Sequence, residues 1–124
     1  MKAIITLLIS ICLTLNVVAQ ESKAIKKIEV AALQKKISRN IQLVDVRTAK
    51  EYNEGHIGNA INIDYNASDF EANIQKLNKN KRVYIYCRTG NRSAKASEKM
   101  STWGFRKIYV LPTGMDGWKK EVSK

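Results

Sequence analysis

The residues best suited to chemistry stand together in one short segment, which reads Cys87-Arg88-Thr89-Gly90-Asn91-Arg92 and is followed by Ser93. Gly90 and Asn91 tolerate positive φ angles, so the segment can curl its backbone amides inward as an anion-binding nest. Two arginine charges beside a thiol favour the thiolate, which is the nucleophilic form of cysteine. The spacing therefore predicts a reactive cysteine in a cradle that can also hold a small oxyanion.

The elements on either side of this segment would position it. Residues 82–87 form a compact run that predicts a buried strand, and residues 93–103 carry Ala96, Met100 and Trp103 at helical spacing. The N-terminus of that helix would supply free N–H groups and the positive end of a dipole. Both effects favour a thiolate at Cys87.

Strands and helices alternate along the rest of the chain. Further strands are predicted at 25–30, 41–46, 60–63 and 108–111, and further helical segments at 31–38, 48–52, 69–77 and 115–122. Thr48 and Ser68 are the expected N-caps of two of these helices. The alternation predicts an α/β fold with a central, mostly parallel five-stranded sheet flanked by helices on both faces. In such sheets chemistry occurs at the carboxyl ends of strands, where Cys87 would lie.

Length and composition exclude several classes of protein. A chain of 124 residues allows one domain, and 44% apolar with 27% charged residues is typical of a folded globule. One histidine and two cysteines are too few for a structural zinc site. The sequence shows no self-similarity at a fixed period, so a repeat array is not expected.

The N-terminal residues have the pattern of a secretory signal. A positive start at Lys2 is followed by an apolar run from Ala3 to Val18, with small residues before Gln20. We expect a signal peptide over 1–19, a short linker over 20–24 and a single domain over 25–124. This predicts export to the periplasm, with no stable membrane insertion after cleavage. An uncleaved membrane anchor is the minor alternative, because the apolar run is short for a spanning helix.

Cleavage would remove Cys12 and leave Cys87 as the single thiol. One cysteine in an exported chain cannot form an internal disulfide, so the thiol needs another reason. A buried apolar cysteine is the plainer interpretation. The neighbours of Cys87 favour a reactive one.

The segment from Tyr86 to Ala94 resembles the active-site loop of rhodanese-like domains. The resemblance continues in four other stretches, which are Leu43-Val44-Asp45-Val46-Arg47, Glu51-Tyr52, Gly55-His56-Ile57 with Ala60-Ile61-Asn62-Ile63, and Gly104-Phe105 with Gly114-Met115-Asp116-Gly117-Trp118. These cover nearly the whole chain after the signal, in the same order and spacing. The chain is therefore similar to a rhodanese-like domain, and within that family to the small periplasmic thiosulfate sulfurtransferases.

The resemblance implies a sulfurtransferase that works through a persulfide on Cys87. Thiosulfate or a related persulfide would be the donor. Cyanide or a thiol would be the acceptor, and a thioredoxin-like protein is one candidate. The resemblance implies no metal and no organic cofactor. The substrate-binding residues would be the remainder of the loop: Arg88, Thr89, Gly90, Asn91, Arg92 and Ser93. Arg88 and Arg92 would bind the sulfonate end of the donor, with an outward orientation of either as the alternative.

Four further residues are expected to act as structural support. Asp45 would fix neighbouring loops by hydrogen bonds rather than act as a base. Arg47 and Glu51, four residues apart, are expected to pair on one helical face. His56 would be a hydrogen-bonded structural residue rather than the partner of the cysteine.

Loop length and several departures refine the family interpretation. Phosphatase-like relatives have loops one residue longer than the six residues here, which disfavours phosphate-ester chemistry. Gly58-Asn59 and Asp64 stand where the family often has Pro-Gly and a proline, and these changes put the shape of the pocket in doubt.

Removing Lys2 lowers the formal charge from +11 to +10, and the remaining basic residues are scattered. No nucleic-acid recognition motif is present. The charge would attract anionic donors or an anionic envelope surface, or would be a solvated surface with no partner. Two functions stay open, an enzyme with turnover and a persulfide carrier or binding module that serves a redox partner.

Overall fold

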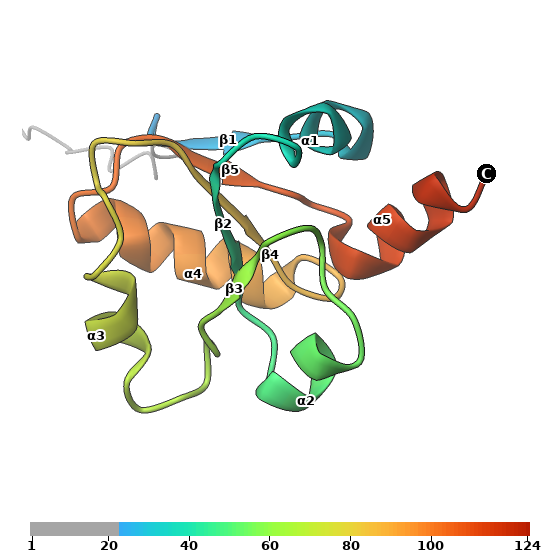
Figure 1. Ribbon diagram of the computed structural model, residues 1–124. Helices are drawn as coiled ribbons and strands as arrows, with labels where there is room; N and C mark the ends of the chain where they lie inside the picture. The colour runs from blue at the N-terminus through green and yellow to red at the C-terminus, as the bar shows by residue number, and fades with distance from the viewer. Residues whose placement is uncertain (1–22) are drawn as a thin grey trace, which may run out of the picture.

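Five parallel strands form the centre of the molecule, as a computed structural model of residues 23–124 shows (Figure 1). The strands are β1 (Ile25–Lys27), β2 (Gln42–Asp45), β3 (Ile61–Asn62), β4 (Val83–Tyr86) and β5 (Ile108–Val110). Their order in the sheet is β1-β5-β4-β2-β3, and all four pairings are parallel. The expected signal segment 1–19 lies outside the described residues, as do the linker residues 20–22.

Helices cover both faces of the sheet, as predicted. They are α1 (Val30–Lys36), α2 (Ala49–Asn53), α3 (Phe70–Ile74), α4 (Asn91–Thr102) and α5 (Gly114–Val122). Helices α1 and α5 contact each other and pack on one face, and α3 and α4 pack on the other. Within residues 23–124, none of the helices has the length and apolar character needed to cross a bilayer.

The buried strand β4 divides the core into two clusters. Val83 and Ile85 pack toward α3 and α4, whereas Tyr84 and Tyr86 pack toward α1 and α5. All four residues of the strand are buried, because alternate side chains of a central parallel strand face two covered surfaces. Among the described residues, the two clusters together include side chains from all five helices and from strands on both sides of β4.

The structure corrects several predicted boundaries. The helix expected over 69–77 is shorter, because residues after Ile74 tighten into i→i−3 hydrogen bonds, and its N-cap is Asp69 rather than Ser68. Helix α4 begins at Asn91, two residues before the expected start. The strand expected over 60–63 pairs only at 61–62. Thr48 is confirmed as an N-cap, and its hydroxyl accepts from the Glu51 amide in a capping box.

Candidate active site

Cys87 lies directly after β4, at the carboxyl end of a central strand, and is 1% exposed. Its Sγ accepts hydrogen bonds from the Gly90 amide at 3.1 Å and from the Ser93 amide at 3.4 Å. The Ser93 Oγ lies 3.4 Å from the same sulfur. The sulfur is therefore enclosed by the first turn of α4, where backbone N–H groups have no partner inside the helix.

Two opposing effects set the acidity of this thiol. Burial raises the pKa of Cys87, whereas hydrogen bonds from the Ser93 hydroxyl and from the Ser93, Gly90 and Thr89 amides lower it, and the net shift is downward. The Ser93 hydroxyl also lies 3.1 Å from the Gly90 carbonyl oxygen, so its single hydrogen can point to either acceptor. A thiolate attracts that hydrogen and gains the Ser93 hydroxyl as a donor in addition to the amides. The site thus favours the nucleophilic form.

The fold of the loop depends on a glycine at position 90. Gly90 has a φ of +105°, and a Cβ atom there would run into the carbonyl oxygen of Pro112. Glycine alone satisfies both constraints, because it has no Cβ and adopts positive φ readily. Close contact with the chain after β5 therefore holds the loop in its curled shape.

Helix α5 holds the loop from the other side. The Met115 amide donates to the Cys87 carbonyl at 2.8 Å, and the Asp116 amide donates to the Arg88 carbonyl at 3.1 Å. Gly114 permits this approach, since a Cβ there would lie 2.5 Å from both carbonyl oxygens. In the sequence, the segment 114–118 indicates the family resemblance and the start of a helix, but not this contact with the loop. A glycine just before a helix in the closing region was the only available signal.

Arg92 forms a bidentate ion pair with Glu51 rather than facing the sulfur. Its Nη1 and Nη2 donate to the two carboxylate oxygens at 2.7 and 3.0 Å. The hydrogen bond to Arg92 is the largest cause that lowers the pKa of Glu51, to about 2, with further hydrogen bonds from Thr48. The expected pair between Arg47 and Glu51 is therefore wrong. Glu51 instead pairs with Arg92, 41 residues away in the chain, because α2 and the start of α4 meet at the loop.

Arg47 instead pairs with Asp45, which is fully buried. Its Nε and Nη2 donate to the carboxylate at 2.7–3.0 Å, and Nη2 also donates to the Gly55 carbonyl at 2.7 Å. Burial opposes the charge of Arg47, and contacts with Asp45 raise its pKa. Asp45 thus fixes the chain after β2, consistent with the structural role expected of it.

The other predicted residues occupy more exposed positions. The Arg88 side chain is 67% exposed and lies 3.6 Å from the Asp116 carboxylate, so the outward alternative describes it. Thr89 and Asn91 are exposed, and Ser93 is fully buried. His56 is exposed, stacks on the Tyr52 ring at 4.0 Å, and lies with its Nδ1 3.3 Å from the Tyr52 carbonyl oxygen.

The departures from the family pattern are accommodated locally. Gly58 takes the positive φ of its turn, at +49°, and Asn59 does not. The Asp64 carboxylate accepts from the Asn66 amide at 2.9 Å, which closes a side-chain turn.

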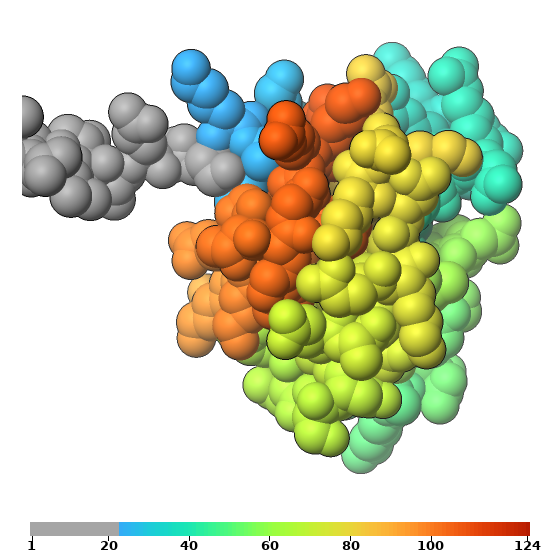
Figure 2. Space-filling model, turned by 90° about the vertical axis from the view of Figure 1, so that its left-hand side faces the viewer, coloured from blue at the N-terminus to red at the C-terminus, as the bar shows by residue number. Residues whose placement is uncertain are grey.

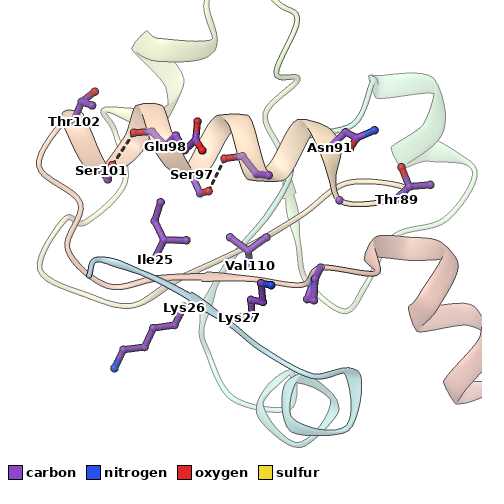
Figure 3. A pocket seen from close by; sticks show the side chains of 13 residues that line it. Ile25, Lys26, Lys27, Thr89, Asn91, Ser97, Glu98, Ser101, Thr102 and Val110 are labelled. Carbon is purple, nitrogen blue, oxygen red and sulfur yellow. Dashed lines mark hydrogen bonds between the residues drawn. The ribbon is translucent and has the colours of Figure 1, made fainter. Parts of the chain in front are cut away.

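A groove of about 1070 Å³ begins at the loop and runs along α4 (Figure 3). Thr89, Gly90 and Asn91 form one end, and Ile25 and Val110 belong to the strands beneath it. Cys87 does not line this groove. The Ser97 and Ser101 hydroxyls on its helix wall donate to carbonyls of α4 itself, at 2.7 Å.

The buried cysteine, its amide cradle and the parallel sheet define an α/β protein with an activated thiol at the end of a central strand. Comparison with known proteins assigns the family. Residues 29–121 match the rhodanese-like domain, so the chain belongs to that family. Over 97 residues it is 33% identical to the thiosulfate sulfurtransferase GlpE of Coxiella burnetii, covering 78% of this chain and 87% of that protein.

Two further relatives extend the comparison. The chain is 30% identical over 102 residues to a Bacillus subtilis protein named as a candidate sulfur carrier, YrkF. The match covers 81% of this chain but spans only about half the length (54%) of that relative. A rhodanese-like domain protein from Staphylococcus aureus has a similar structure, with 36% identity, a TM-score of 0.67, and coverage of 75% of this chain and 90% of that one. The family supports sulfur transfer as the general chemistry.

Replacing the Ser93 hydroxyl should make Cys87 less reactive near neutral pH. We expect Ser93→Ala to raise the pKa of the thiol, because one donor to the thiolate is lost, and to slow alkylation by iodoacetamide at pH 7 several-fold. The rate measured against pH gives the pKa directly. Ser97→Ala is the matched control, since its hydroxyl bonds only within α4. Equal effects of the two variants would show that the Ser93 hydroxyl does not act on the sulfur.

Neutralising Glu51 should destabilise the fold at neutral pH and not at low pH. The folded-state pKa of about 2 lies below the ordinary value of 4.5, so the ion pair stabilises fully above about pH 4.5 and is lost as the pH falls toward 2. Glu51→Gln should lower the free energy of unfolding by about 1–2 kcal/mol at pH 7, after allowance for partial exposure.

Urea denaturation at pH 7 and at about pH 2, where the folded-state carboxyl becomes protonated, measures this difference. Glutamine retains the capping position, so the variant isolates the ion pair. Glu54→Gln is the control, because Glu54 is exposed and forms no salt bridge with another of the residues 23–124. A difference that stays constant between the two pH values would contradict the assignment.

Proposed function

We propose that this protein transfers the sulfane sulfur of thiosulfate, or of a related persulfide donor, through a persulfide on Cys87. The observation that carries the proposal is the buried Sγ enclosed by the Gly90 and Ser93 amides and the Ser93 hydroxyl. Those donors favour the thiolate before reaction and are placed to stabilise negative charge on the sulfur added to it.

In the first half-reaction the Cys87 thiolate attacks the outer sulfur of thiosulfate. A sulfur–sulfur bond forms to Cys87 as the bond between the two sulfurs of thiosulfate breaks, and sulfite leaves with that bonding pair. The total charge is unchanged, and the product is an anionic persulfide. Arg88 is exposed beside the cradle and can attract the dianionic donor, whereas Arg92 is engaged by Glu51 and acts by positioning the loop.

In the second half-reaction an acceptor nucleophile takes the terminal sulfur. Cyanide attacks that sulfur, the bond to Cys87 breaks, and the products are thiocyanate and the regenerated Cys87 thiolate. A thiol acceptor would receive the sulfur in the same way. A protein acceptor of the thioredoxin-like type is part of this proposal.

A second candidate is a persulfide carrier that loads sulfur but turns over only with its own partner. The similarity to a relative named as a candidate sulfur carrier favours it. The low exposure of Cys87 also fits a site that opens to a specific partner.

Turnover of thiosulfate and cyanide separates these functions. We expect thiocyanate production by the chain beginning at Gln20, and loss of it in Cys87→Ser, because no other cysteine remains there to carry the persulfide. Ser97→Ala should retain activity and shows that the assay tolerates a change on α4.

Intact-mass analysis after thiosulfate treatment completes this test. A wild type that gains one sulfur without producing thiocyanate would be a carrier. A wild type with neither activity nor mass gain would overturn both forms of the proposal.

Export is the second part of the proposal, supported by the positive start, apolar run and small residues of the N-terminal sequence. We expect N-terminal sequencing of the protein recovered from the periplasmic fraction of an expressing bacterium to begin at Gln20. Ala19→Leu places a bulky residue before the cut and should leave the chain uncleaved, with Lys23→Gln as a control that is cleaved normally. A cytoplasmic chain of full length would contradict export.

A further inference from the structure

Parallel strands bring every strand start to one edge of the sheet, opposite Cys87. Three segments that lead into β2, β4 and β5, residues 36–41, 79–82 and 104–107, lie along this edge, and residues 23–24 lead into β1. Figure 1 shows the connections before β1, β4 and β5 on its left-hand side, and Figure 2 views the molecule from that side. We call this surface the basic edge, and its cations are Lys23, Lys36, Arg39, Lys79, Lys81, Arg82, Arg106 and Lys107.

The four described segments of the basic edge consist of basic and uncharged residues. None of these four segments contains an aspartate or a glutamate. Within residues 23–124, none of the eight cations forms a salt bridge. By contrast, the segments that follow the strands at the Cys87 edge contain Glu51, Glu54, Asp64 and Asp116 together with basic residues, and two of these acids pair with Arg92 and Arg88. Positive charge without an acidic partner is therefore concentrated at the strand starts.

The fold holds the turn before β4, which belongs to the basic edge, in a fixed position. The Gln42 side chain donates to the Asn78 and Arg82 carbonyls and accepts from the Asn78 amide, which ties the turn before β4 to β2. The Lys79 Nζ lies 5.5 Å from the Phe105 ring centre. These contacts leave a shallow hollow of about 380 Å³ lined by Lys36, Arg39, Lys81, Arg82 and Lys107.

The position of the chain start relates this edge to the N-terminal sequence. Lys23 and Ala24 join β1 at the basic edge, so residues before 23 attach to the fold there. The apolar run Ala3 to Val18 precedes them in the sequence. Before cleavage, the expected signal segment would therefore be joined to the fold at the basic edge, which is opposite Cys87.

We propose that the basic edge docks on an anionic phospholipid bilayer and directs Cys87 away from the membrane. Lysine and arginine near a negatively charged leaflet each add to binding, and the phosphate of a lipid headgroup complements the hollow. Four adjacent strand starts, about 5 Å apart, present the cations along one edge of the sheet. Nucleic acid fits less well, because Phe105 is buried and Tyr109 stacks on Tyr84 instead of offering an open stacking surface.

Co-sedimentation with vesicles tests the proposal. The chain beginning at Gln20 retains both core clusters and should bind vesicles of phosphatidylglycerol and phosphatidylcholine, but not vesicles of phosphatidylcholine alone. Binding should be lost between about 0.1 M and about 1 M salt, as the Debye length falls from ~10 to ~3 Å. Lys81→Gln combined with Lys107→Gln should weaken binding about tenfold or more.

Lys119→Gln combined with Lys120→Gln is the matched control, since it removes the same charge from the exposed surface of α5. This control should bind within a factor of about two of the wild type. Equal losses in the two double variants would show a general charge effect and overturn the assignment to the basic edge. Equal binding to neutral vesicles would overturn the electrostatic basis. Retention on immobilised heparin without binding to vesicles would overturn the membrane proposal and indicate a soluble polyanion as the partner of the basic edge. Thiocyanate production is measured on the same samples. It should be unaffected by the substitutions at the basic edge, so that a failure of vesicle binding can be told apart from a failure of sulfur transfer.

Discussion

The hydrogen bonds that the first turn of α4 makes to the Cys87 sulfur are the interaction on which the rest of the site depends. A thiol buried in an apolar core is normally an inert group with a raised pKa, because the charged form is poorly solvated there. Here the amides of Gly90 and Ser93 take the place of solvent, and they are already fixed by the helix. Burial can then exclude water from the sulfur without forcing it to stay protonated.

That arrangement requires the loop to be held on three sides. The chain after β5 approaches Gly90 so closely that no side chain fits, α5 donates two amides to the carbonyls of Cys87 and Arg88, and α2 holds Arg92 through Glu51. Each contact joins parts of the chain that are more than 20 residues apart. The parallel sheet makes this possible because it brings the segments after successive strands to one edge. The short helix α2 is thus part of the site although none of its residues touches the sulfur.

Local sequence was sufficient to predict the elements and the cysteine but not their long-range contacts. The alternation of strands and helices, the buried run of β4 and the cap at Thr48 depend on neighbours within a few residues, and they were predictable. The partner of Glu51 was not, because helical spacing points to Arg47 and only the folded chain brings Arg92 beside it. The same reason applies to Gly114, because a side chain there would collide with the carbonyls of Cys87 and Arg88, which are distant in the sequence. Helix ends such as Ile74 shifted because tighter turns replaced regular helix there.

The same topology places the cysteine site and the unpaired basic residues at opposite edges of the sheet. At one edge the acids pair locally, Asp45 with Arg47, Glu51 with Arg92, and Asp116 with the exposed Arg88. At the opposite edge the turns before the strands carry lysines and arginines that have no acidic partner in the segments leading into β1, β2, β4 and β5. On the proposed function, the overall positive charge would attract an anionic donor to the molecule, and the oriented amides of the cradle would bind it. A site built from backbone amides can be selective in a strongly basic protein because its donors are aimed at one atom.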